Sequence, residues 1–154
     1  MNNNININND KYNIAVVGLG TIGYGVCSII NNNHDLNLYA VADLDEEKIK
    51  QVKQIKNDIQ TYKDYHDLFN DDNINLIVET MGGLHQAFEL IKTSLEKQIP
   101  VVTANKEVVA AKYEELVNLS IKNNTPFYFE ASVGGTIPII NSLYHYSYID
   151  KIKE

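Results

Sequence analysis

The chain has 154 residues, 44% of them apolar, which is enough for one domain with a hydrophobic core. Its formal net charge is −7 and it contains no arginine, so the basic stripe of a nucleic-acid-binding protein is excluded. No apolar run approaches the roughly 18 residues that span a bilayer, and we expect no membrane partner either.

Residues 1–11 form an Asn-rich tail without the basic start and apolar stretch of a secretory signal, and we expect this tail to be disordered. Cys27 is the only cysteine, which excludes a disulfide within the chain and fits a reducing, cytoplasmic location. Because Cys27 falls on an expected helix, we interpret it as a small core residue rather than a nucleophile.

From residue 12 onward, short β-branched runs alternate with segments of helical periodicity. The spacing predicts strands over 12–17, 38–42, 74–79, 99–103 and 127–131, helices over 22–32, 45–56, 84–95 and 106–122, and a short helical connector over 61–70. Such alternation predicts an α/β fold, a Rossmann-type doubly wound and mostly parallel sheet with helices on both faces. We place a dinucleotide-binding domain at 12–137.

Residues 138–154 permit two interpretations. Pro138 is well placed to open a helix, because proline suits the first helical turn. Tyr144, Tyr146 and Tyr148 alternate with polar residues, as in a strand.

The best-defined motif is Gly18-Leu-Gly-Thr-Ile-Gly23, a GxGxxG turn between an expected buried strand and an expected helix. Gly18 permits the tight turn, Gly20 lets a pyrophosphate approach the backbone, and Gly23 lets helix and strand pack closely. The amides of Thr21 and Ile22 lie at the helix N-terminus, which attracts phosphate, and the Thr21 hydroxyl suits either a cap or a phosphate contact. The motif predicts dinucleotide binding.

Asp43 ends the second expected strand, twenty residues after Gly23. A carboxylate there accepts hydrogen bonds from the adenosine ribose and repels a 2′-phosphate. No arginine is present to hold such a phosphate, and Lys48 is the only nearby cation. We therefore predict NAD as the favoured cofactor, with NADP left open. The alternative is a carboxylate that only caps a turn or helix.

Two further strand ends carry candidate ligand-binding groups, because ligands gather at the carboxyl ends of parallel strands. In Glu79-Thr-Met-Gly-Gly83, the glycines permit close approach of a nicotinamide ribose. The alternative is a loop that only leads into the next helix. In Val102-Thr-Ala-Asn-Lys106, Lys106 opposes the helix dipole, which suggests a role in holding an anionic or carbonyl-bearing ligand. A solvated lysine is the alternative.

The segment from Glu130 to Pro138 follows the last expected strand. Its Gly134-Gly135 turn can aim several backbone carbonyls at one point, an arrangement that hard cations favour. From composition alone, a bare turn is the favoured interpretation of this segment.

Taken together, four blocks resemble homoserine dehydrogenase, from about Tyr12 to the end of the chain: Gly18–Gly25, Glu79–Gly83, Val102–Lys106 and Glu130–Ile140. The resemblance implies an NAD(P)-dependent oxidoreductase that interconverts L-homoserine and L-aspartate 4-semialdehyde, in threonine, methionine and isoleucine biosynthesis. The first block is generic, whereas the third and fourth are specific in this order and spacing.

The resemblance also implies residue roles. The first block and Thr80, Gly82 and Thr103 would bind cofactor, and Lys106 would lie beside nicotinamide and substrate, orienting the substrate or relaying a proton. Backbone carbonyls would bind a monovalent cation, sodium in most relatives, and the residues that match are Glu130, Val133, Gly135 and Ile137. Thr136 stands where the family commonly has glycine, which puts the local turn geometry in question.

Relatives of this type continue into a substrate-binding and dimerising domain that carries a second catalytic lysine. We expect residues 138–154 to begin the connection to that domain, which is absent from these 154 residues. The chain alone is then expected to bind cofactor with little turnover, and the longer protein to be a homodimer. The alternatives are another Rossmann amino-acid or sugar dehydrogenase, or a stand-alone NAD-sensing or interaction module without catalysis.

Overall fold

The computed structural model describes residues 11–135 and 137–147. The expected disordered tail therefore lies, except for residue 11, outside the described residues. The elements are β1 (Tyr12–Val17), α1 (Thr21–Asn31), β2 (Leu36–Ala42), α2 (Glu46–Ile55), β3 (Gln60–Tyr62), the 3₁₀ helix η1 (Tyr65–Asn70), β4 (Leu76–Glu79), α3 (His85–Glu96), β5 (Val101–Thr103), α4 (Lys106–Asn123), β6 (Phe127–Tyr128), the 3₁₀ helix η2 (Glu130–Ser132) and α5 (Ile139–Ser147).

The strands form one six-stranded sheet in the order β3-β2-β1-β4-β5-β6, and every neighbouring pair is parallel. This is the strand order of the Rossmann fold, and it confirms the predicted fold class. The chain reverses its direction of progress across the sheet between β1 and β4, so the carboxyl ends of these two strands flank the place where such folds bind ligands.

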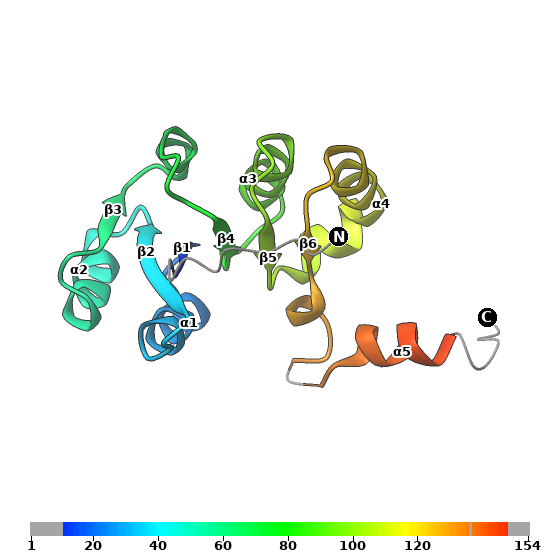
Figure 1. The fold of residues 1–154 in the computed structure, drawn as a ribbon, viewed down its shortest axis with the longest axis horizontal. Coiled ribbons are helices and arrows are strands. Elements are labelled where there is room, and N and C mark those ends of the chain that lie inside the picture. Colours follow the sequence, from blue (N-terminus) through cyan, green and yellow to red (C-terminus); the bar gives the residue numbers. More distant parts are fainter. Residues whose placement is uncertain (1–10, 136, 148–154) are drawn as a thin grey trace, which may run out of the picture.

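Helices cover both faces of the sheet, with α1 and α2 on one side and α3 and α4 on the other (Figure 1). Alternation along β1 supplies both cores, because successive side chains point to opposite faces. Ala15 and Val17 belong to the cluster under α3 and α4, whereas Ile14 and Val16 pack with the residues of α1 and α2. These buried residues pack the sheet between the two helix layers.

The prediction of one helical connector over 61–70 is wrong in its first part. Residues 60–62 form the edge strand β3, which pairs with β2, and the helical turn begins only at Tyr65. Tertiary contacts explain the difference: the hydroxyls of Tyr39 and Tyr62 both donate to Asp71 Oδ2, at 2.9 and 3.0 Å, and so fasten β3 to the sheet. Local periodicity does not encode this contact.

The last expected strand, 127–131, is shortened to Phe127–Tyr128, because residues 130–132 turn into η2. Beyond it, the helical interpretation of Pro138 is confirmed and the strand interpretation of Tyr144 and Tyr146 is wrong; Tyr148 lies outside the described residues. The Glu130 carboxylate accepts hydrogen bonds from the amides of Ile140 and Asn141, at 3.0 and 3.1 Å, and so caps α5. The helix projects away from the sheet (Figure 1).

Cys27 is fully buried in the core under α1, and burial raises the pKa of its thiol to about 12. Its interpretation as a core residue is confirmed. Among the described residues, none of the helices combines the length and apolarity that a bilayer crossing requires.

Candidate functional site

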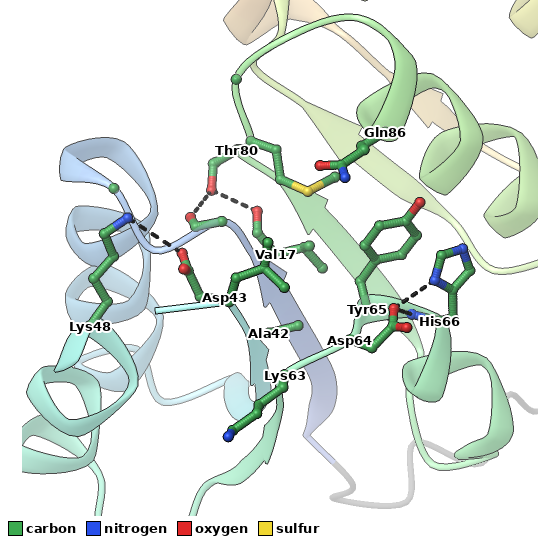
Figure 2. A pocket seen from close by; sticks show the side chains of 15 residues that line it. Val17, Ala42, Asp43, Lys48, Lys63, Asp64, Tyr65, His66, Thr80 and Gln86 are labelled. Atoms are coloured by element: carbon green, nitrogen blue, oxygen red, sulfur yellow. Dashed lines mark hydrogen bonds and ion pairs between the residues drawn. The ribbon is translucent and has the colours of Figure 1, made fainter. Parts of the chain in front are cut away.

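A cavity of about 520 Å³ opens at the carboxyl ends of β1, β2, β3 and β4. Val17 lies between Asp43 and Lys48 on one side and Tyr65 on the other (Figure 2), and Gly18 also lines the cavity. The cavity therefore occupies the crevice predicted from the strand order. Of the residues predicted to bind cofactor, it brings together Gly18, Gly20, Asp43, Thr80 and Gly82.

Two glycines of the turn are required by sterics. Gly18 has φ +89°, and a Cβ there would lie 2.8 Å from the Met81 amide nitrogen. A Cβ on Gly23 would lie 1.9 Å from the carbonyl oxygen of Gly18, closer than any side chain permits. The Thr80 hydroxyl fastens the same carbonyl, donating to it at 2.6 Å. The turn is thus packed against the end of β4.

Gly20 differs, because a Cβ there would meet no heavy atom within 4 Å. It occupies the N-cap position of α1, and no side chain caps this helix. Thr21 is therefore the first helical residue and not the cap, and both Thr21 and Ile22 are exposed. A helix N-terminus with open space and uncapped amides is suited to bind a phosphate.

Asp43 links the glycine turn to the loop after β2. Its Oδ2 accepts a hydrogen bond from the Leu19 amide at 2.6 Å, and its Oδ1 accepts one from the Asp45 amide at 2.9 Å. Lys48 Nζ lies 3.9 Å from Oδ2. Each carboxylate oxygen has further acceptor capacity, so Asp43 can hold the turn and still receive a ribose hydroxyl.

One wall of the cavity was not predicted. Lys63 and Asp64 line it from the loop after β3, and Tyr65 and His66 line it from the start of η1. The rings of Tyr65 and His66 stack with centroids 4.1 Å apart, and the Asp64 carboxylate accepts a hydrogen bond from the His66 amide at 2.9 Å. Hydrogen bonds from the main chain and ring of His66 lower the pKa of the Asp64 carboxyl. The signal that was missed is the β-branched and aromatic pair Thr61 and Tyr62, which marks a short strand whose carboxyl end must face the crevice.

A second group of residues lies at the ends of β4 and β5. Glu79 is fully buried, and its carboxylate accepts hydrogen bonds from the Thr103 hydroxyl and, at 2.6 Å, from the Met81 amide. Burial raises the pKa of this carboxyl, against the opposing effect of the hydrogen bonds. Thr103 is also fully buried, so neither its side chain nor its main chain is exposed at the surface.

Lys106 is exposed at the first residue of α4, directly after the N-cap Asn105. Within the described part of the chain, no hydrogen bond or ion pair involves its ammonium group. A cation at a helix N-terminus lacks the favourable dipole interaction that it would have at the other end. The ammonium group is therefore available to an incoming anionic or carbonyl oxygen.

The predicted cation-binding segment has a donor set of suitable chemistry, because main-chain carbonyls are hard oxygen ligands. Gly134 and Gly135 both have positive φ, +71° and +61°, and form the turn expected there. The carbonyls of Glu130 and Ile137 each accept one backbone hydrogen bond, from Val133 and Ile139, which leaves each a second lone pair. In donor chemistry, these carbonyls match the ligands of a hard monovalent cation.

Comparison with known proteins identifies relatives of this chain. A family model described as homoserine dehydrogenase, NAD binding domain, matches residues 18–130. Homoserine dehydrogenase of Helicobacter pylori is 36% identical over 141 residues, 86% of this chain and 32% of that protein. A crystal structure of homoserine dehydrogenase from Thiobacillus denitrificans is 25% identical, with a TM-score of 0.82, and covers 94% of this chain and 35% of that one.

A hyperthermophilic archaeal homoserine dehydrogenase in complex with NADPH is also similar, with 30% identity and a TM-score of 0.71 over 87% of this chain and 48% of that one. The chain spans about a third of the length of the curated relatives from Bacillus subtilis and Helicobacter pylori. The family model covers well over half of the chain and includes the glycine turn, Asp43, Thr80 and Lys106. The chain therefore belongs to the homoserine dehydrogenase NAD-binding domain family.

Proposed function

We propose that the chain is the cofactor-binding part of an NAD(P)-dependent oxidoreductase that interconverts L-homoserine and L-aspartate 4-semialdehyde. The observation that carries the proposal is the cavity of about 520 Å³ at the strand ends, which joins the open N-terminus of α1 to Asp43. Family membership supports the choice of reaction. The reaction belongs to the biosynthesis of threonine, methionine and isoleucine.

In this proposal, the pyrophosphate lies on the amides from Gly20 to Gly23, at the N-terminus of α1. The adenosine ribose meets Asp43, so the adenosine half occupies the cavity between the ends of β2 and β3. The nicotinamide half must then extend the other way, toward Thr80, Gly82 and the end of β5, because the dinucleotide crosses the sheet at its reversal point.

We propose that NAD is preferred to NADP. Asp43 is only 11% exposed at its side chain, so its charge is poorly screened from a 2′-phosphate. The two cavity lysines are already paired with carboxylates, Lys48 with Asp43 and Lys63 with Glu46. Neither lysine is therefore free of a carboxylate neighbour when a phosphate arrives.

Lys106 is proposed to orient the substrate or to help relay its hydroxyl proton. When bound, the nicotinamide supplies the hydride acceptor or donor for the homoserine C4 carbon. An exposed ammonium group that is free of partners among the described residues can approach the substrate oxygen, and much of the rate would come from such positioning and electrostatics. The main acid-base lysine is expected outside these residues.

The carbonyls of Glu130, Val133, Gly135 and Ile137 are proposed to hold a sodium ion. Homodimer formation in the longer protein and a cytoplasmic location remain predictions from the sequence. The 154-residue chain is proposed to bind dinucleotide with little or no turnover of homoserine.

Isothermal titration of the purified chain with NADH and NADPH, together with a homoserine turnover assay, tests these proposals. We expect binding of both reduced dinucleotides, tighter for NADH, and negligible turnover. Tighter binding of NADPH would overturn the cofactor preference, and no binding of either would overturn the function. A turnover rate typical of complete dehydrogenases would contradict the proposal that this chain binds dinucleotide with little turnover.

A further inference from the structure

A chain of hydrogen bonds joins the carboxyl ends of β4 and β5. Glu79, the last residue of β4, accepts from the Met81 amide through Oε1 and from the Thr103 hydroxyl through Oε2. The Thr103 oxygen in turn accepts a hydrogen bond from the Asn105 amide at 3.0 Å. Glu79 and Thr103 are both fully buried, and Asn105 is 8% exposed.

Asn105 closes this chain of bonds with both ends of its side-chain amide. Its Oδ1 accepts from the Val108 amide at 3.1 Å and caps α4. Its Nδ2 donates to the carbonyl of Met81 at 3.2 Å and to that of Gly83 at 2.8 Å. Glu79 therefore holds the amide side of the Met81–Gly83 turn, and Asn105 holds its carbonyl side.

Joining two strands through a buried carboxyl group carries a large desolvation free energy. Removing it from water is unfavourable unless every oxygen is bonded, and burial raises the pKa of Glu79 accordingly. Apolar side chains join the same strands elsewhere in the sheet, for example Ile77 and Val101. What the polar residues add is a fixed orientation of the turn that lines the cavity and of the helix start that carries Lys106.

We propose that Glu79, Thr103 and Asn105 form a positioning frame that holds the Met81–Gly83 turn against the first turn of α4, so that the nicotinamide end of the dinucleotide is received between this turn and Lys106. The inference rests on the proposed function as a dinucleotide-binding domain. The three residues act through the backbone that they hold, and are positioning residues rather than catalytic ones.

The test compares two ligands that share the adenosine and pyrophosphate groups. NADH carries the nicotinamide, whereas ADP-ribose lacks it, so the ratio of their Kd values reports only on the nicotinamide end. Isothermal titration of the 154-residue chain would give both Kd values for Glu79→Gln, Thr103→Val and Asn105→Ser. Serine retains the N-cap function of residue 105 but cannot reach both turn carbonyls, so this variant is expected to fold even where Glu79→Gln does not.

We expect each frame variant that folds to weaken NADH binding about 10-fold, the effect of losing about one well-made hydrogen bond, and ADP-ribose binding by no more than about twofold. Thr103→Ser keeps the hydroxyl and should restore NADH affinity relative to Thr103→Val. The matched control is Ser94→Ala, which removes another buried hydrogen bond, from Ser94 to the Leu90 carbonyl in α3. It should leave the Kd ratio unchanged.

The outcomes separate the two proposals. If the parent chain binds neither ligand, the proposed function fails and the positioning frame fails with it. If the parent chain binds both and Asn105→Ser or Thr103→Val weakens the two ligands equally, or neither of them, the frame is overturned while the proposed function stands.

Discussion

The two halves of the ligand-facing edge use their polar groups in different ways. Around β1 and β2, polar groups face open space: α1 has no side-chain cap, and a Cβ on Gly20 would meet no heavy atom within 4 Å. Asp43, which also bonds to two backbone amides, borders a cavity of about 520 Å³. Around β4 and β5, the buried polar side chains of Glu79 and Thr103 bond to each other and to the backbone.

This difference indicates a division of work between affinity and geometry. Open amides at a helix N-terminus stabilise a bound phosphate through hydrogen bonds and the helix dipole. Satisfied buried networks bind nothing themselves, but they fix the backbone around them, which is the requirement for placing a reacting ring. Changes in the first half should therefore alter binding of every ligand with the shared pyrophosphate.

The largest effect is expected from Gly23→Ala. The new Cβ would lie 1.9 Å from the Gly18 carbonyl, so the helix must move away from the turn. We expect binding of both NADH and ADP-ribose to fall below detection, and the free energy of unfolding to fall by about 1–3 kcal/mol. Titration calorimetry and urea unfolding measure the two quantities.

Gly25→Ala is the matched control, because a Cβ at this helical glycine meets no heavy atom within 4 Å. It should leave binding unchanged and stabilise α1 by about 0.5–1 kcal/mol. Equal loss of binding in both variants would contradict the steric role assigned to Gly23.

The reactivity of Cys27 measures how well the core between α1 and the sheet excludes solvent. Burial raises the pKa of its thiol to about 12, so the thiolate that alkylating agents require is scarce at neutral pH. We expect iodoacetamide to label the folded chain about 1000-fold more slowly than the urea-unfolded chain, which mass spectrometry can follow.

The pH dependence of this labelling has a definite sign. Below its raised pKa the native thiol gains thiolate about tenfold per pH unit, so native labelling should accelerate as pH rises. NADH and ADP-ribose should slow labelling equally, since both engage the turn above α1. Rapid labelling of the folded chain at pH 7 would show that this core is open.

Asp43→Asn should change the choice of cofactor. Removing the charge takes away the repulsion of a 2′-phosphate, and we expect the ratio of the NADPH and NADH Kd values to shift toward NADPH by about tenfold. Asp45→Asn is the control, because asparagine also caps a helix and Asp45 does not line the cavity. If the ratio of the two Kd values is unchanged in Asp43→Asn, the carboxylate only bonds the turn amides and does not select the cofactor.

The smallest effect concerns Lys106 in the second half. Lys106→Gln removes a cation from the N-terminus of α4, and the free energy of unfolding should rise by about 0.3–1 kcal/mol at low salt. Lys122→Gln, in the last turn of the same helix, should lower it by a similar amount. ADP-ribose binding should be unchanged in both variants. A fall in the free energy of unfolding for Lys106→Gln would contradict an unfavourable interaction between the Lys106 charge and the dipole of α4.

The glycine turn and the Rossmann sheet were predictable because each depends on local rules. A strand, a GxGxxG turn and a helix follow one another within Tyr12–Asn31, and strand-helix alternation with right-handed crossovers leaves few ways to order a parallel sheet. The wall formed by Lys63 to His66 has only a weak local signal, the pair Thr61 and Tyr62 in a strand of three residues. It depends on Asp71, which holds the end of β3 through Tyr62.

The sequence by itself determined the fold class and the family, since these rest on periodicity and on motifs of adjacent residues. Only the tertiary structure decided how the buried polar residues are used. Thr103 and Asn105 each lie 24 residues after their partners Glu79 and Met81, and these pairs bond only because β4 and β5 are neighbours in the sheet. Hydrogen bonds between strand ends depend on strand order and register, and neither is written in any single segment.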